Sequence, residues 1–102
     1  MKQFIMIMTD TQRLDMVSCY ENSGISTPCL ESLAREGIKF DKAYTTQPVC
    51  GPARSALFTG QYPCVNGSFA NSLALGANVK TIGQRLSDQG IATGYIVLSL
   101  IH

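Results

Sequence analysis

The chain has 102 residues, of which 45% are hydrophobic and 15% are charged, and its formal net charge is +1. This length allows one small domain with a modest core. Because the charge is nearly balanced and the basic residues are scattered, the composition argues against nucleic acid or an anionic membrane as a partner held by a general electrostatic field.

The first predicted element is a buried strand over residues 4–9. Its apolar run is too short for a membrane span or for the core of a signal peptide. Continuous apolar character over so few residues is typical of a strand covered on both faces. We therefore expect a cytoplasmic protein with no membrane association as the sequence is written, or a periplasmic or secreted one if the native N-terminus is longer.

A helix and a second strand are predicted after the polar stretch at residues 10–22. Thr27 can cap the helix, Pro28 suits its first turn, and Gly37 suits its end. The strand is expected over residues 38–45 because β-formers alternate there.

The second half of the chain is predicted to hold two more helices and a last strand. We expect a short helix over residues 52–58 that is stopped by Gly60 and Pro63. A loop is expected over 61–80, because it contains the turn formers Pro63, Asn66-Gly67, Asn71 and Gly76. A helix over 81–90 that opens with a capping box and a strand over 91–101 follow. This order of elements indicates an α/β fold with a mostly parallel sheet flanked by helices.

The four cysteines, at positions 19, 29, 50 and 64, are expected to be free thiols. Their spacings match no zinc template, and the only histidine is the last residue. Without a secretion signal, disulfides are not the default.

Asp10 is the first candidate functional residue. It follows the first predicted strand, and ligands of open α/β sheets lie at the carboxyl ends of strands. A carboxylate there suits a hard-cation ligand or a general base. The alternative is that Asp10 only caps a turn.

Cys50 and Arg54 are the second candidates. A cysteine at the start of a helix lies at the positive end of the helix dipole, and an arginine one turn later can reach the same end. Together they favour an anion or an oxyanionic side chain at position 50. A small apolar cysteine beside a surface arginine is the alternative. The Cys-x5-Arg spacing of cysteine phosphatases and the Gly-Lys-Ser/Thr of a Walker loop are both absent.

Residues 50–54 read CGPAR and residues 59–60 read TG, which resembles the sulfatase signature Cys-x-Pro-x-Arg followed by Thr-Gly. The stretches FIMIMTDTQR, STPCLESLAREGIKF and VKTIGQRLSDQGIATGYI fit the same family, so the resemblance covers residues 3 to 96. It implies that residues 1–102 are the N-terminal part of a sulfatase catalytic domain. The fold would then be an incomplete alkaline-phosphatase-like α/β fold.

In sulfatases the motif cysteine is oxidised to Cα-formylglycine, and the resemblance carries this over to Cys50. The catalytic residues would be Cys50 and Arg54, and the modification motif Cys50, Pro52 and Arg54. One hydroxyl of the hydrated aldehyde attacks sulfur, and the second later expels sulfate. The implied partners are a formylglycine-generating enzyme and an aryl or sugar sulfate ester.

The resemblance also implies a divalent cation, usually calcium, held beside the formylglycine. Asp10 and the modified Cys50 match ligands of that site. Many sulfatases have a second aspartate directly after the first, where this chain has Thr11. Gln12 is a nearby amide that could substitute. Related phosphonate and phosphodiester hydrolases also vary at this position.

The chain departs from the family at residues 97–102. Sulfatases typically continue Gly-Lys-Trp-His after the Gly-Tyr-Ile strand, and this chain does not. We interpret the change at Val97 as a frameshift or a premature end, and His102 as unrelated to the catalytic histidine. The chain alone is expected to be inactive and to self-associate. A phosphonate or phosphodiester hydrolase of the same superfamily and a non-catalytic α/β remnant remain alternatives.

Overall fold

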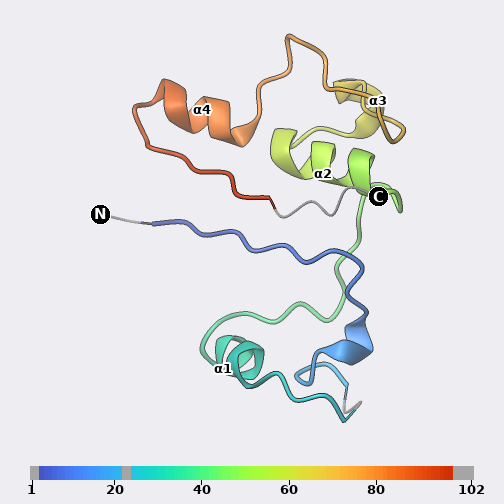
Figure 1. The fold of residues 1–102 in the computed structure, drawn as a ribbon, viewed down its shortest axis with the longest axis vertical. Coiled ribbons are helices and arrows are strands. Elements are labelled where there is room, and N and C mark those ends of the chain that lie inside the picture. Colours follow the sequence, from blue (N-terminus) through green and yellow to red (C-terminus); the bar gives the residue numbers. More distant parts are fainter. Residues whose placement is uncertain (1–2, 22–23, 98–102) are drawn as a thin grey trace. The chain divides into compact units, whose positions relative to one another are not determined.

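Helices are the only regular elements in the residues that the computed structural model describes, which are 3–21 and 24–97 (Figure 1). The chain divides into two units, Met1–Ala43 and Tyr44–His102, and each is described by itself. The elements in chain order are the 3-10 helix η1 (Leu14–Met16) and the α-helices α1 (Pro28–Glu36), α2 (Cys50–Thr59), α3 (Pro63–Asn66) and α4 (Ile82–Asp88).

The first unit joins the segment after η1 to the start of α1. As predicted, α1 begins at Pro28 after Thr27, but the Thr27 side chain does not cap its own helix. Its Oγ1 instead accepts a hydrogen bond from the backbone N–H of Ser18 at 3.0 Å, and the Ser18 Oγ accepts one from the Thr27 N–H at 3.0 Å. This reciprocal pair joins Ser18 to Thr27, nine residues later in the chain. The Thr27 hydroxyl is therefore used by a distant residue and does not cap α1.

A second contact in the first unit surrounds Lys39. Its ammonium lies 2.9 Å from the Asp41 carboxylate, donates to the Cys19 carbonyl at 3.3 Å and sits 5.0 Å from the centre of the Tyr20 ring. The hydrogen bond with Asp41 raises the pKa of Lys39 above its ordinary value. The Tyr20 hydroxyl donates to the Phe40 carbonyl at 3.0 Å, so the chain after α1 returns beside the chain after η1.

In the second unit, α2 starts two residues before the predicted helix and ends at Gly60, whose φ of 68° is left-handed. Glycine adopts this conformation without steric cost, so the residues around Gly60 are sufficient to end the helix. Pro63 was expected only to stop α2, but it begins α3, inside the stretch that we predicted as a loop. A proline can serve both roles because the first helical position needs no N–H.

The sequence-predicted capping box of α4 is confirmed. The Thr81 side chain accepts from the Gln84 N–H, and the Gln84 side chain accepts from the Thr81 N–H at 2.8 Å. At the other end, Gly90 has φ of +75°, and the N–H groups of Gly90 and Ile91 donate to the carbonyls of Ser87 and Leu86. These two bonds form a Schellman motif, so both ends of α4 are satisfied by neighbouring residues.

The centre of the second unit lies where α2 packs against α3 and α4 (Figure 1). Within the described ranges, its buried residues are small or polar; they are Pro52, Ala56, Pro63, Asn66 and Ser68. An edge-on contact between the rings of Phe58 and Tyr95, with centroids 5.6 Å apart, joins α2 to the chain after α4. Hydrogen bonds around α2 add to this ring contact.

The predicted sheet is not confirmed by the structure. Residues 4–9 and 38–45 and the described part of the last predicted strand, 91–97, run as irregular chain, and residues 98–101 of that strand lie outside the described residues. The physical reason is that a strand needs a neighbour to pair its backbone N–H and C=O groups. No described residue of these three apolar segments is part of a strand.

All four cysteines are free thiols, as the sequence predicts. None of the helices within 3–21 and 24–97 is long and apolar enough to span a membrane.

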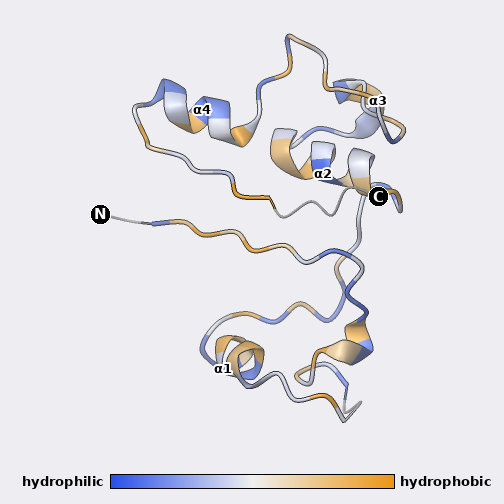
Figure 2. Ribbon diagram, in the orientation of Figure 1, coloured by the Kyte–Doolittle hydropathy of each residue, from blue (hydrophilic) through white to orange (hydrophobic). Residues whose placement is uncertain are grey.

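The apolar segments that were predicted as strands are largely exposed. Phe4, Ile5 and Ile7 are each at least 77% exposed, and Ile96 is 98% exposed. Figure 2 shows hydrophobic residues along the N-terminal segment and again along the chain that follows α4. Exposed apolar segments with unpaired backbone are sites of association with other chains.

We predict that the purified chain self-associates through these segments. Replacing Ile5 and Ile7 together by lysine should shift it towards the monomer, because charge on an unpaired edge opposes strand pairing. Size-exclusion chromatography with light scattering at several concentrations measures this. The matched control places lysines at Gln3 and Thr9, which adds the same charge without removing apolar surface. A concentration-independent monomer for the unmodified chain would contradict the prediction.

Candidate active site

Cys50 lies at the start of a helix, as the sequence indicates, and is the first residue of α2, two residues before the predicted range; its side chain is exposed. The preceding residue, Val49, has no side-chain acceptor, so α2 has no cap of its own. Pro52, in the first turn, has no N–H to satisfy and is buried. The N-terminal end of α2 carries the positive partial charge of the helix dipole, which lies beside the Cys50 thiol.

Asn71 supplies the missing acceptor from a loop 20 residues further along the chain. Its Oδ1 accepts a hydrogen bond from the Gly51 N–H at 3.0 Å and lies 3.5 Å from the Cys50 sulfur, within hydrogen-bonding reach of the thiol. Because a backbone N–H can only donate, this bond determines which end of the amide faces α2. The sequence alone indicates Asn71 only as a turn former, and no local signal links it to Cys50.

Gly51 has a packing role in this contact. A Cβ built on Gly51 would lie 2.8 Å from the Asn71 Oδ1, closer than side chains tolerate. The absence of a side chain at position 51 therefore lets the Asn71 amide approach both the Gly51 N–H and Cys50. Gly51, which lies between Cys50 and Pro52 in the motif, therefore affects the geometry around Cys50.

A chain of hydrogen bonds continues from Gly51 along one side of α2. The Ser55 Oγ donates to the Gly51 carbonyl and lies 2.9 Å from the Oγ of buried Ser68. The Ser68 Oγ also lies 3.2 Å from the Leu73 carbonyl. These contacts hold the loop that carries Asn71 against α2.

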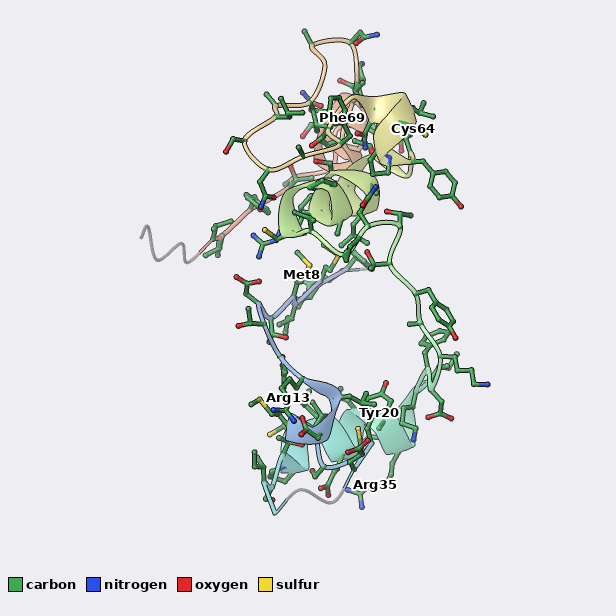
Figure 3. All side chains as sticks on the ribbon, turned by 90° about the vertical axis from the view of Figure 1, so that its right-hand side faces the viewer. Met8, Arg13, Tyr20, Arg35, Cys64 and Phe69 are labelled. Atoms are coloured by element: carbon green, nitrogen blue, oxygen red, sulfur yellow. The ribbon has the colours of Figure 1, made fainter. Side chains whose placement is uncertain are left out.

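Asn66 anchors the same loop at the far end of α2. This side chain is 1% exposed. Its Oδ1 accepts from the Ser68 N–H at 2.9 Å, while its Nδ2 donates to the Thr59 hydroxyl and to the Gln61 carbonyl, both at 3.2 Å. Figure 3 labels Cys64 on α3 and Phe69 on the loop that leads from Asn66 back towards Asn71. The loop is therefore fixed to α2 at both ends of the helix.

Arg54 lies on α2 four positions after Cys50 and is half-buried. Residues four apart in a helix share one side, so the guanidinium and the group at position 50 can reach the same space. An exposed nucleophile-bearing position, a helix N-terminus and an arginine are suited to an anionic substrate or a developing oxyanion.

The predicted metal ligands Asp10, Thr11 and Gln12 belong to the first unit, whereas α2 belongs to the second. All three are exposed, and the chain bends at Asp10. Thr11 has φ of 50°, which is unusual for a β-branched residue and costs conformational energy. Within residues 3–21 and 24–97 no three acidic, cysteine or histidine side chains gather into a group that could hold a metal ion. His102 lies outside the described residues.

Comparison with known proteins gives one consistent family. The sequence model of the family described as Sulfatase matches residues 2–99. The chain is 47% identical over 93 residues to the uncharacterized sulfatase YidJ of Escherichia coli (strain K12), covering 91% of this chain and 19% of that protein. It is 38% identical over 86 residues to an ulvan-active sulfatase of Formosa agariphila, covering 84% of this chain and 17% of that protein.

A further relative is the N-acetylglucosamine-6-O-sulfatase of Bacteroides thetaiotaomicron, 33% identical over 92 residues, with 90% of this chain and 16% of that protein covered. The chain thus spans less than a fifth of the length of these curated relatives. No solved structure matches it significantly.

We predict that Asn66→Ala destabilises the second unit by about 2–3 kcal/mol, because the Ser68 N–H and the Gln61 carbonyl lose a partner in a buried site. Urea unfolding followed by circular dichroism of the whole chain measures this. Val65 lies on the same helix but is 66% exposed, so Val65→Ala should change the free energy of unfolding by about 0.5 kcal/mol or less. Equal losses for the two variants would show that the Asn66 network is not what holds the unit.

We also predict that this chain binds calcium more weakly than about 1 mM, because calcium takes six to eight oxygen ligands and the described residues offer no such cluster. Isothermal titration calorimetry should detect no difference between the unmodified chain and Asp10→Asn. Micromolar affinity that Asp10→Asn abolishes would show that these residues complete a calcium site without further ligands.

Proposed function

The chain belongs to the sulfatase family, whose members share an alkaline-phosphatase-like α/β fold, and we propose that it is the N-terminal part of a sulfuric ester hydrolase. In this proposal, Cys50 is the residue that becomes formylglycine. The observation that carries it is the position of Cys50: an exposed side chain at the first residue of α2, followed by buried Pro52 and by Arg54 one turn later.

Each motif residue then has a physical role. Exposure leaves Cys50 accessible to a modifying enzyme and to substrate. Pro52 fits the first helical turn, where its missing N–H costs nothing and its ring packs into the unit. Arg54 supplies a permanent positive charge on the side of α2 that the residue at position 50 shares. Formylglycine at position 50 would supply the oxygen nucleophile that attacks sulfur.

The chain's own residues would bind and orient the sulfate group. The positive end of α2 and the Arg54 guanidinium both favour the negative charge of a sulfate ester, and they favour it more as charge grows in the transition state. Such stabilisation is commonly the largest contribution to rate in reactions of this kind.

For the divalent cation, the described residues fit only in part. The exposed Asp10 carboxylate at a bend is a suitable ligand, and the Gln12 amide is a candidate for the position next to it, where Thr11 carries no carboxylate. The remaining oxygen ligands are not among the described residues, so we propose Asp10 as one contribution to a shared site, with calcium as the cation.

We also propose that residues 4–9, 38–45 and 91–97 become strands of a parallel sheet in a complete sulfatase domain. Their apolar side chains are exposed here, and such segments gain both pairing and cover when neighbouring strands are present. The proposed substrates are aryl or sugar sulfate esters, and the proposed modifying partner is a formylglycine-generating enzyme.

The proposal predicts a mass change at Cys50. Co-expression with a formylglycine-generating enzyme should lower the mass of the tryptic peptide 43–54 by about 18 Da, because the thiol sulfur is replaced by an aldehyde oxygen and two hydrogens are lost. Peptide mass spectrometry measures it. Cys64→Ser is the matched control and should leave conversion unchanged, whereas Cys50→Ser should abolish it for an enzyme that accepts only cysteine.

An unconverted thiol, under conditions that convert an established substrate, would count against the proposal. Once formylglycine is present, parallel assays with aryl sulfate, phosphodiester and phosphonate esters identify the reaction class. The 102-residue chain alone should show no measurable turnover, since each missing charge-stabilising group commonly costs about 10²–10³ in rate.

A further inference from the structure

We propose that Asn71 is a positioning residue that holds both the N-terminus of α2 and the side chain at position 50. One oxygen has two partners here: Asn71 Oδ1 lies 3.0 Å from the Gly51 nitrogen and 3.5 Å from the Cys50 sulfur. The motif at residues 50–54 does not include Asn71, which lies 21 residues after Cys50 in the sequence.

Helix α2 has no side-chain cap from its own N-terminal residue. Helix N-termini leave backbone N–H groups without intrahelical partners, and a side-chain oxygen normally satisfies one of them. Val49, the residue in the capping position, has no such oxygen, and no side-chain cap is formed there. Asn71 therefore acts as a cap from a distant part of the chain, on the second residue of the helix.

The loop that carries Asn71 holds this amide in place beside α2. Ser68 and Asn66 are each 1% exposed, and their hydrogen bonds to α2 and its flanks hold the loop on both sides of Ser68. Gly51 leaves the space that Oδ1 occupies, since a Cβ would come within 2.8 Å. The exposed Asn71 side chain is therefore held in position by the buried residues of its loop and by the space that Gly51 leaves.

The Asn71 oxygen also lies beside the side chain at position 50. An acceptor oxygen beside it favours a side chain that presents a hydrogen on that side, whether the S–H of cysteine or an O–H of hydrated formylglycine. Asn71 would thereby fix the rotation of this side chain relative to the helix axis and to Arg54. This consequence for catalysis rests on the proposed function, whereas the capping contact itself does not.

The test measures amide hydrogen exchange at single-residue resolution by mass spectrometry, using the whole chain in dilute solution. Asn71→Ala should make the Gly51 amide exchange about three- to tenfold faster, because a cap and its hydrogen bond are lost. Asn71→Asp should keep the protection, since it retains the acceptor oxygen and its charge suits a helix N-terminus. Asn78→Ala, at another exposed asparagine of the same loop, should leave Gly51 unchanged.

Three results would overturn the proposal: unchanged exchange at Gly51 in Asn71→Ala, equal acceleration throughout α2, or the same acceleration in Asn71→Asp as in Asn71→Ala. The last two would mean that Asn71 supports the fold in general rather than this end of the helix.

A parallel measurement of Cys50 conversion separates this inference from the proposed function. An enzyme that reads residues 50–54 does not need Asn71, so Asn71→Ala should be converted as fully as the unmodified sequence. Loss of conversion in every variant, with the expected exchange pattern, would overturn the proposed function and leave the Asn71 contact standing. Normal conversion with unchanged Gly51 exchange would overturn the role of Asn71 alone.

Discussion

Helix α2 has no side-chain acceptor of its own at its N-terminus, and the organisation of the second unit follows from this constraint. Val49 offers no acceptor oxygen, and Pro52 in the first turn has no N–H that needs one. The loop after α3 binds α2 at both ends, because the Asn71 Oδ1 accepts from the Gly51 N–H at the start of α2, while the Asn66 Nδ2 donates to the Thr59 hydroxyl at its end. The geometry around Cys50 thus depends on residues that lie well outside the five-residue motif.

The same constraint explains why the centre of this unit is polar. A helix joined to a loop by side-chain hydrogen bonds can form from residues close in sequence, and its buried serine and asparagine are stable only because each has a partner. The apolar segments behave in the opposite way. Phe4, Ile7 and Ile96 can be covered only by other strands and helices, so they remain exposed where those neighbours are not present.

In the proposed sulfatase site, one helix and its loop place Cys50 and Arg54. Asp10 lies in the other unit, at a bend where Thr11 adopts a left-handed conformation. As the proposed metal ligand, it would have to be joined by oxygen ligands that the described residues do not supply. The proposed modification site is therefore contained in the second unit, whereas the proposed metal site depends on long-range assembly.

The sequence by itself determined the features that depend on neighbouring residues. Cys50 at the start of a helix, the end of α2 at Gly60, the capping box of Thr81 and Gln84, and the family membership could all be predicted, because each rests on a few adjacent residues or on a short motif.

Tertiary structure alone decided the remaining features. Thr27 bonds to Ser18 instead of its own helix, Asn71 instead of Val49 caps α2, and Pro63 opens a helix as well as following one. The predicted strands did not form a sheet in the described residues, since pairing needs a partner that a local pattern cannot specify. Hydrogen bonds between residues nine or twenty positions apart leave no periodic or spacing signal in a single sequence, so only the folded chain could reveal them.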